Sequence, residues 1–398
     1  MNLAVIFFRF GPYHLARLRA VGAIVELTAI EASGRTAEYD WDVVEAAPNF
    51  NRLTLFPDGR HREQPLPELR ARMDRALSEA NPDAVAIPGW DDPAALSALR
   101  WCQDHGVPTI VMSASTALDT ERRWWREAVK GRVVRNYDAG LGGGTRHAEY
   151  LQTLGMPPGR TFTGYNVVDN SHFAEGARSA RADAEALRRE YELPARYFLA
   201  VGRFIPKKNL DGLLRAYSRY RDRADDPWAL VVLGNGPLDD DVRRWRRELD
   251  LDEHVFLPGF KQYDELPVYY GLADAFVHAS RREQWGLVVN EAMAAGLPVV
   301  VSDRCGCAPD LVEEGRNGFS FSPSDDDALT DALVRIASPD CDRAAMGGAS
   351  REIIADWTPE TFARQLLRAA RAAREHVNSS SEKTSWFDTL LLEALMRR

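Results

Sequence analysis

The chain has 398 residues, of which 45% are hydrophobic and 27% are charged. This composition is typical of a folded globular protein and not of a disordered chain, and the length exceeds what one hydrophobic core usually supports, so two or three domains are expected. The formal net charge of -9 argues against general nucleic-acid binding, which needs a basic surface.

The first half of the chain alternates short apolar runs with amphipathic segments. Strands are predicted at 3–8, 24–30, 83–88, 108–112 and 137–141, and helices at 66–80 and 93–105. Helices that connect parallel strands produce this alternation, so a parallel sheet is expected. The loop after the first strand holds Gly11 and His14. Both are candidate ligand contacts, because such loops bind ligands in doubly wound sheets, although His14 could instead be a surface histidine at a helix start.

Residues 121–135 (ERRWWREAVKGRVVR) interleave arginine and lysine with Trp124 and Trp125. Such a basic, tryptophan-containing segment can form a helix at a membrane surface. The alternative is a solvated helix whose tryptophans pack in the core, and this interpretation is preferred. Peripheral membrane contact through 121–135 is kept as the second hypothesis.

A polar, alanine-rich stretch at 170–186 precedes a second alternating region. Its strands are predicted at 197–201, 230–233, 255–257, 274–279 and 298–302, and helices at 325–336 and 358–375. A second parallel sheet is therefore expected. The predicted domains are 1–169 and 191–357, joined by a linker at 170–190 and followed by a C-terminal helix and tail at 358–398.

Charged and glycine-containing loops follow the strands of the second region. Arg203 and Lys208 come after strand 197–201, where a diphosphate would receive a planar fork from the arginine and a point charge from the lysine. Two solvated surface charges are the alternative. Tight turns follow the next two strands and hold Gly234, Phe260 and Lys261.

A short, largely apolar helix is predicted at 286–295, and its polar residues are Asn290 and Glu291. A buried Glu291 needs hydrogen bonds, either from a polyol ligand or from a neighbouring arginine in the core. Glu283 lies just before the helix, where free amides and the positive end of the helix dipole attract phosphate. Gly286 lets the backbone approach a ligand closely.

The whole phrase at 283–303, EQWGLVVNEAMAAGLPVVVSD, resembles the signature of the retaining GT-B glycosyltransferases of family 4, in which two glutamates are separated by seven residues. The resemblance implies an α/β fold with two Rossmann-like doubly wound domains that face each other across a cleft. It also implies that the second domain holds most of a nucleotide-sugar donor, the first binds the acceptor, and C-terminal helices cross back to the first.

The resemblance further implies roles for individual residues. Glu291 would bind the ribose, Arg203 and Lys208 the diphosphate, and Glu283, with the backbone of Trp285, Gly286 and Leu287, the transferred sugar and proximal phosphate. Gly234, Phe260, Lys261 and Gly11 would complete the donor site. The family often has a histidine after the strand at 108–112, but this chain has Ser113 and Ser115 there, which are weak substitutes and suggest a different acceptor.

The predicted activity is metal-independent transfer of a hexose with retention, by same-face attack in which Glu283 positions the sugar. No cofactor is expected, and a UDP-sugar is slightly preferred over a GDP- or ADP-sugar as donor. The acceptor would be a glycan, a lipid-linked sugar or a small molecule. A nucleotide-sugar epimerase, a pseudo-glycosyltransferase and a noncatalytic nucleotide-sugar scaffold are the alternatives.

Four cysteines are too few for a disulfide framework in this length, which favours a reducing cytoplasm. Cys305 and Cys307 could bind metal, but they lack an accompanying cluster, so packing is preferred and no metal site is expected. The first eight residues lack a basic leader and a cleavage site, and no apolar run reaches membrane-spanning length. The expected location is the cytoplasm, with the inner face of the membrane as an alternative.

Overall fold

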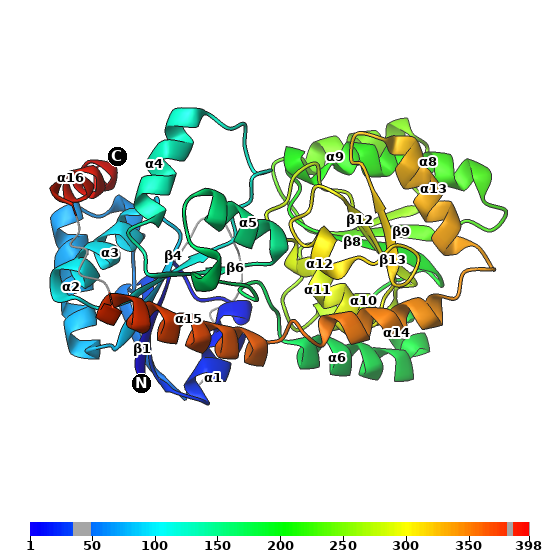
Figure 1. Ribbon diagram of the computed structural model, residues 1–398. Helices are drawn as coiled ribbons and strands as arrows, with labels where there is room; N and C mark the ends of the chain where they lie inside the picture. Colours follow the sequence, from blue (N-terminus) through cyan, green and yellow to red (C-terminus); the bar gives the residue numbers. More distant parts are fainter. Residues whose placement is uncertain (35–48, 380–384, 398) are drawn as a thin grey trace. The chain divides into compact units, whose positions relative to one another are not determined.

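The computed structural model describes residues 1–34, 49–379 and 385–397. The chain forms two compact units, one made of Met1–Val167 with Pro359–Arg398 and the other of Val168–Thr358 (Figure 1). Each unit is built around one parallel sheet, as the alternation of strands and helices predicts.

The sheet of the first unit has seven strands in the order β3-β2-β1-β4-β5-β6-β7. They are β1 (Asn2–Phe7), β2 (Glu26–Ser33), β3 (Asn51–Phe56), β4 (Ala84–Pro88), β5 (Thr109–Ser113), β6 (Ala139–Gly142) and β7 (Thr161–Phe162). Strands β4 and β5 are buried throughout, which explains their continuous apolar sequences. The edge strand β3 was not predicted, because its first two residues are exposed and its apolar pattern is short.

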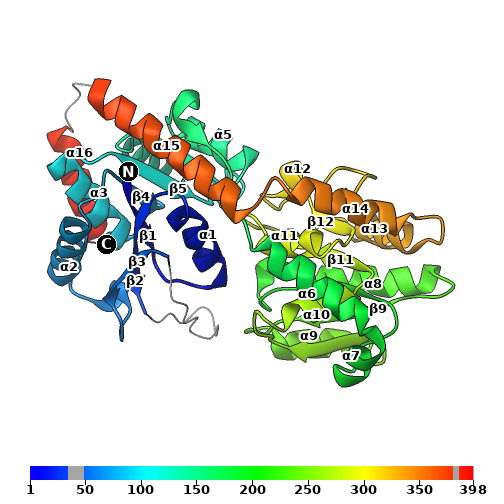
Figure 2. The same ribbon diagram turned by 90° about the horizontal axis from the view of Figure 1, so that it is seen from below.

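Helices cover both faces of this sheet (Figure 2). One face carries α2 (Leu66–Ala80), α3 (Pro93–His105) and α16 (Trp386–Met396), and the other carries α1 (Pro12–Gly22) and α15 (Pro359–Ser379). The remaining helical segments are η1 (His61–Glu63), α4 (Trp124–Val134), α5 (Thr145–Thr153) and η2 (Pro158–Arg160).

The C-terminal helices belong to the first unit. Arg17 of α1 is buried, donates to the Tyr165 carbonyl at 2.9 Å, and places its guanidinium 5.7 Å from the Phe362 ring of α15. The last part of the predicted tail forms α16, whose Leu392 and Met396 are buried. The segment is therefore a packed helix, because its apolar face finds a partner in α3.

The second sheet has six strands in the order β10-β9-β8-β11-β12-β13. They are β8 (Tyr197–Val201), β9 (Ala229–Leu233), β10 (Val255–Gly259), β11 (Ala275–His278), β12 (Val299–Ser302) and β13 (Gly318–Phe321). The helices are α6 (Asn170–Ala182), α7 (Ala184–Glu190), η3 (Pro206–Lys208), α8 (Leu210–Arg223), α9 (Asp239–Glu248), α10 (Leu266–Leu272), α11 (Leu287–Ala294), α12 (Ala308–Leu311), α13 (Asp326–Ala337) and α14 (Arg343–Ile354).

The segment interpreted from sequence as a linker, 170–190, folds as α6 and α7 of the second unit. Phe173, Ala177 and Ala180 are buried. Their spacing of four and three residues is that of one helix face, which the polar composition of the segment concealed.

Each sheet reverses its strand order at one point, between β1 and β4 in the first unit and between β8 and β11 in the second. Ligands of open parallel sheets bind outside the carboxyl ends of the strands at such a switch point. A ligand site is therefore expected at the loops that follow these four strands.

Two observations bear on the membrane hypotheses. Among the described residues, no helix combines the length and the apolar character needed to cross a membrane. The preferred interpretation of 121–135, with tryptophans in the core, is wrong, because Trp124 is 83% exposed and Trp125 is also exposed. Both lie in the first turn of α4, whereas the buried residues Val133 and Val134 lie at its end.

Candidate active site

The switch point of the second sheet brings a carboxylate and two lysines together. Lys208 ends η3, which follows β8, and its ammonium group forms an ion pair with Glu283, which follows β11. Lys207 Nζ lies 3.8 Å from the other carboxylate oxygen. The side chains of Lys208 and Glu283 are only 14% and 13% exposed, so solvent screens their interaction weakly.

His278, which was not predicted as a site residue, completes this cluster. It is the last residue of β11, is buried, and places Nε2 3.8 Å from Glu283 Oε2 and 3.1 Å from Ser280 Oγ. The signal in the sequence was its place at the end of the predicted strand 274–279. A histidine that ends a buried strand at a switch point lies beside the site.

The surroundings keep Glu283 charged. Burial alone would raise the pKa of Glu283, but His278 and the positive charges of Lys208 and Lys207 outweigh it and hold this pKa well below its usual range. Burial and the charge of Lys208 lower the pKa of His278. The site at neutral pH therefore combines a carboxylate, two ammonium groups and a neutral imidazole.

Main-chain hydrogen bonds hold the loop that carries Glu283. The Glu283 carbonyl accepts from Gly306 N–H at 2.9 Å, and its N–H donates to the Arg304 carbonyl at 3.3 Å. Cys305 and Cys307 in the facing loop are fully buried thiols that form no disulfide with another described cysteine, in agreement with the packing interpretation. No group of side chains that could hold a metal ion occurs in the described part of the chain.

Helix α11 begins beside this loop. Its N-cap, Gly286, has φ 105°, a left-handed conformation that costs a residue with a Cβ about 1–2 kcal/mol. The side chain of Trp285 is buried and donates through Nε1 to Asn290 Oδ1 at 2.7 Å, so what it can offer a ligand is its backbone. Leu287 is the first helical residue, and the first N–H groups of a helix have no partner within it.

Glu291 lies one turn further along α11 and is fully buried. The hydroxyl of Tyr270 donates to its Oε2 at 2.7 Å. This tyrosine was not predicted from the sequence, and the contact of Glu291 with a polyol ligand stays a prediction.

The other donor-side candidates occupy neighbouring strand ends. Arg203 is exposed, and no ion-pair partner for it occurs among the described residues. The loops of Gly234 and Gly202 touch, because a Cβ at Gly234, which has φ 137°, would lie 1.9 Å from the Gly202 carbonyl oxygen. Phe260 is half-buried, and Lys261 Nζ lies 3.7 Å from Glu265 Oε1.

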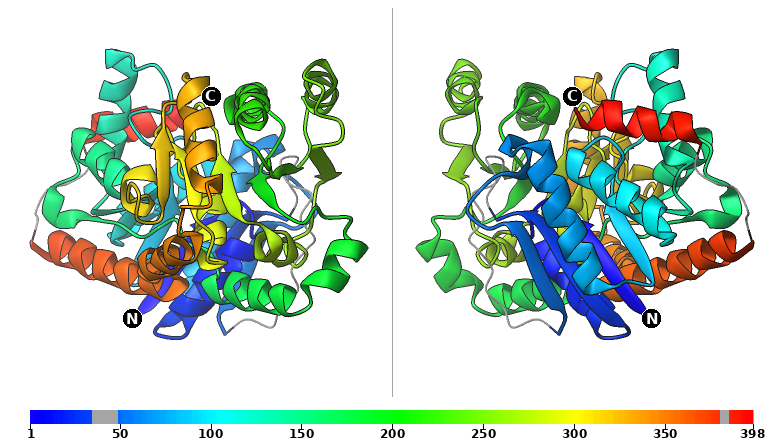
Figure 3. Two further views of the ribbon diagram at one scale, coloured as in Figure 1. Left: turned by 90° about the vertical axis from the view of Figure 1, so that its right-hand side faces the viewer. Right: turned by 90° about the vertical axis from the view of Figure 1, so that its left-hand side faces the viewer.

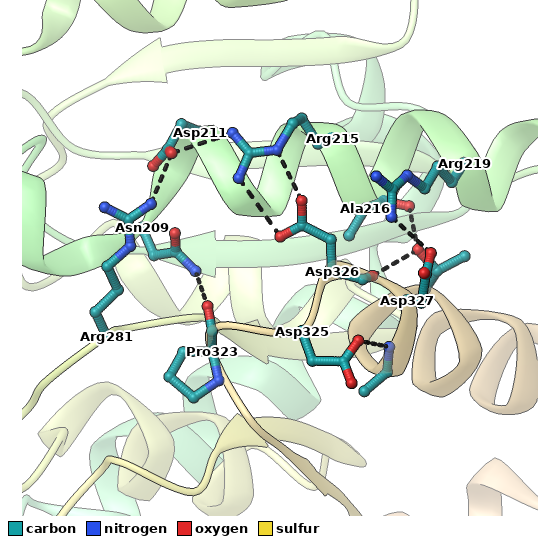
Figure 4. Close-up of polar contacts among 12 residues, drawn as sticks. Asn209, Asp211, Arg215, Ala216, Arg219, Arg281, Pro323, Asp325, Asp326 and Asp327 are labelled. Carbon is teal, nitrogen blue, oxygen red and sulfur yellow. Dashed lines mark hydrogen bonds and ion pairs between the residues drawn. The ribbon is translucent and has the colours of Figure 1, made fainter.

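A network of ion pairs ties the lysine loop to the glutamate loop (Figure 4). Asp211, in the first turn of α8, accepts from Arg281 at 2.7 Å and from Arg215 at 3.1 Å. Arg215 also donates to Asp326 of α13 at 2.7 Å. Since Arg281 lies two residues before Glu283, Asp211 holds the loop after β11 against the start of α8.

In the first unit, the loop after β1 holds Gly11 and His14. Gly11 is the N-cap of α1, and its N–H donates to His14 Nδ1 at 3.2 Å. Burial, and then the charge of Arg17, lower the pKa of His14 well below its usual value. His14 is thus a neutral helix-capping side chain, and its role toward a ligand stays a prediction.

Ser113 and Ser115 follow β5 in the same unit. Ser113 is buried and accepts from the Ser115 N–H at 3.1 Å, whereas Ser115 is half-buried. The hydroxyl of Ser113 therefore shapes its own loop, and that of Ser115 is the more accessible.

Two family descriptions match the two units. Glycosyl transferases group 1 matches residues 183–353, and the Glycosyl transferase 4-like domain matches residues 14–166. A GDP-mannose-dependent alpha-(1-6)-phosphatidylinositol monomannoside mannosyltransferase of Mycobacterium tuberculosis is 34% identical over 232 residues, which are 55% of this chain and 56% of that protein. The matched stretch thus spans little more than half of that relative.

A GDP-mannose-dependent alpha-mannosyltransferase of Mycobacterium tuberculosis is 30% identical over 305 residues, which are 72% of this chain and 71% of the relative. Among solved structures, sucrose-phosphate synthase from Thermosynechococcus elongatus has a TM-score of 0.72 at 20% identity and covers 93% of this chain and 98% of its own. This likeness shows the GT-B fold. The resemblance found in the sequence is confirmed, and the chain belongs to the group 1 glycosyl transferases, the glycosyltransferases of family 4.

Proposed function

We propose that this protein is a retaining glycosyltransferase that moves a hexose from a nucleotide-diphosphate sugar to an acceptor hydroxyl. The observation that carries the proposal is the arrangement of Lys207, Lys208 and His278 around Glu283 at the switch point of the second sheet. A leaving diphosphate gains negative charge as its bond to the sugar breaks, and preorganised cations stabilise that charge.

The residues of the second unit take different parts in this proposal. Arg203 and Lys208 bind the diphosphate, and Arg203 is suited to it because it is exposed. Glu283 holds the hydroxyls of the transferred sugar, and Glu291 the ribose. The remaining donor contacts are assigned to the backbone of Trp285, Gly286 and Leu287 and to the strand-end residues Gly234, Phe260 and Lys261.

The proposed reaction needs no covalent intermediate. The bond from the anomeric carbon to the diphosphate oxygen breaks, and its electron pair stays on that oxygen. The acceptor hydroxyl forms the new bond on the same face, and its proton passes to the leaving oxygen. Glu283 is a poor nucleophile in this setting, because Lys208 and Lys207 both engage its oxygens. Arg203 and Lys208 supply the positive charge, so we propose that a metal ion is not required.

We propose GDP-mannose as the donor. The names of the relatives in M. tuberculosis specify GDP-mannose, so the preference for a UDP-sugar drawn from the sequence is not supported. The strand-end turns that would read the base act through their backbone, which is why side-chain identities could not distinguish the nucleotides.

We propose a lipid-linked or glycan acceptor, because one relative is named for a phosphatidylinositol monomannoside. His14, Ser113 and Ser115 in the first unit are the acceptor-side candidates. Of the two serines, Ser115 is the more accessible. Contact of residues 121–135 with the inner face of a membrane belongs to the same proposal, since a lipid-linked acceptor is reached at a bilayer surface.

Binding and turnover of a panel of UDP-, GDP- and ADP-sugars, with and without EDTA, test the proposal. We expect GDP-mannose to be selected in EDTA, and its binding to weaken in Lys208→Ala and Glu291→Ala but not in the surface control Arg243→Ala of α9. Failure of every nucleotide sugar to bind would overturn the function without affecting the fold.

Two further measurements separate the mechanism from its alternatives. The anomeric configuration of the product, followed by NMR, should match that of the donor. Intact-protein mass spectrometry should show no sugar on Glu283, and a trapped adduct would refute same-face attack. Conversion of donor without acceptor into an isomer would indicate an epimerase.

A further inference from the structure

The exposed apolar side chains of the protein are concentrated on two helices of the first unit. Among the described residues, eight large hydrophobic side chains are exposed, and six of them belong to α4, the loop before it and α16. These six, which we call the α4–α16 surface, are Leu118, Trp124, Trp125, Trp386, Phe387 and Leu390. A soluble protein rarely gathers its exposed apolar residues in this way unless they bind something.

The two helices lie side by side although more than 250 residues separate them in the chain (Figures 1 and 3). Arg132 of α4 donates to Asp388 of α16, and its guanidinium lies 4.4 Å from the Phe387 ring. The opposite side of α16 is fastened to the unit by an ion pair between Glu393 and Arg70 and by burial of Leu392. These contacts fix the orientation of α16, so its exposed side chains are not the result of loose packing.

Positive charge accompanies the exposed tryptophans. Arg123 and Arg126 are exposed, and within the described part of the chain neither has an ion-pair partner. The Arg126 guanidinium lies 5.1 Å from the Trp125 ring. By contrast, the deeper Lys130 is paired with Glu127. The unpaired positive charge is thus placed at the exposed first turn of α4, in a chain whose net charge is -9.

We propose that the α4–α16 surface docks the protein on an anionic lipid bilayer. Tryptophan is the side chain that prefers the interface between lipid and water, and Trp124 and Trp386 are 83% and 73% exposed. Arg123 and Arg126 add attraction to anionic headgroups. A second copy of the chain fits less well, because a twofold contact through this surface would gather the unpaired arginines of both copies in one interface.

This inference deepens the proposed function and rests on it for the lipid-linked acceptor. The docking itself requires neither donor nor acceptor. Both helices belong to the first unit, to which the acceptor-side candidates His14 and Ser115 also belong. Docking would bring that unit to the lipid in which such an acceptor is embedded. The segment that forms α16 had no assigned role from its sequence, and the structure assigns it to the same surface as α4.

Flotation of the full-length protein with vesicles tests the proposal. Vesicles of phosphatidylcholine with about one third phosphatidylglycerol should carry the wild type at low salt, and vesicles of phosphatidylcholine alone should carry much less. Trp124→Ala combined with Trp386→Ala should abolish flotation. The matched control is Ile24→Ala, which removes a large exposed apolar side chain elsewhere in the first unit and should float like the wild type.

The contribution of the two arginines to membrane binding is tested with a separate pair of variants. Arg123→Gln with Arg126→Gln should weaken partitioning about 25-fold, at about fivefold for each arginine near the surface, whereas Arg243→Gln with Arg247→Gln on α9 should not change it. Circular dichroism and unchanged transfer to a short water-soluble acceptor would show that the tryptophan variants are folded. No flotation of the wild type, equal flotation of the tryptophan variants, or a dimer that dissociates in them would overturn the proposal. Flotation without transferase activity would instead refute the proposed function alone.

Discussion

Glu31 in the first unit and Glu283 in the second are both carboxylates at the carboxyl end of a sheet, but their surroundings differ. Glu31 is buried, and it accepts from Phe10 N–H at 2.6 Å, from Arg52 at 2.9 Å and from Thr54 at 3.1 Å. These donors fix its oxygens and leave no need for a ligand. Glu283 is held by lysine side chains and an imidazole, groups that can also bind the anionic part of a ligand.

The same contrast applies to histidines. His61 in the first unit lies between Ser33 Oγ at 2.7 Å and Asp92 at 3.0 Å, so it is saturated within the protein. His278 in the second unit shares its surroundings with Glu283 and Lys208. The comparison teaches that burial alone does not mark an active site. The distinguishing property is whether the partners of the buried group are lysine ammonium groups, which can also bind a ligand anion, or a full set of hydrogen bonds within the protein.

The largest effect is expected for a matched pair of glutamate variants. Glu283→Gln should lower kcat by about 10²–10³-fold, the usual loss for one electrostatic group in an active site, while the protein stays folded. Glu31→Gln should lower the free energy of unfolding by about 1–3 kcal/mol, because it leaves Arg52 without its charge partner. Steady-state kinetics and urea unfolding measure the two. An equal loss of stability in both variants would show that Glu283 has the same structural role as Glu31.

Lys208→Ala should lower kcat/KM by about 10²-fold, because the leaving diphosphate loses its nearest fixed ammonium group. Lys207→Ala should have a smaller effect, since Lys207 lies 3.8 Å from Glu283 and is more exposed than Lys208. Kinetics with GDP-mannose compares them. A larger loss in Lys207→Ala would assign the diphosphate to the other lysine.

A third pair uses His14 and His278, whose pKa values both lie below the usual value. Below about pH 6.5, where an unfolded histidine gains a proton, unfolding takes up protons until the folded pKa is reached. Stability should therefore rise with pH through this window and level off above it. Thermal unfolding between pH 5 and 7 should show a flatter dependence in His14→Asn and in His278→Asn.

Activity then separates the two histidines. His278→Asn should lower kcat about tenfold, or about 1.4 kcal/mol in barrier, because His278 orders Glu283, whereas His14→Asn should retain most of the turnover of a water-soluble acceptor. His105→Asn at the exposed end of α3 is the control for both measurements. Loss of turnover in His14→Asn alone would indicate that the residues required for the reaction lie in the first unit.

The smallest effect is expected for Asp211→Asn. Its ion pairs with Arg215 and Arg281 are partly exposed, and such pairs contribute about 0–1 kcal/mol to stability. Because Arg281 precedes Glu283 by two residues, kcat/KM should still fall by a factor of about three. The control Asp327→Asn breaks the pair with Arg219 and should leave kcat/KM unchanged. Equal kinetics in both variants would show that the network is only structural.

The sequence alone determined the fold class and most strands, because parallel strands buried on both faces are continuous apolar runs. Strand 197–201 and helices 66–80 and 93–105 agree with β8, α2 and α3 to the residue. The family signature around Glu283 and Glu291 was equally visible, since its spacing is local. Segments whose burial depends on a distant partner, such as β3 and α16, could not be assigned.

The tertiary structure alone decided which side chains meet. Lys208 and Glu283 are 75 residues apart, and only the strand order places the ends of β8 and β11 side by side. Lys207 entered the site through that contact, whereas Tyr270 reaches Glu291 from α10. The exposed Trp124 and Trp386 became one surface for the same reason. Sequence patterns report the environment of a residue along its own element, whereas neighbours across elements follow from topology and packing.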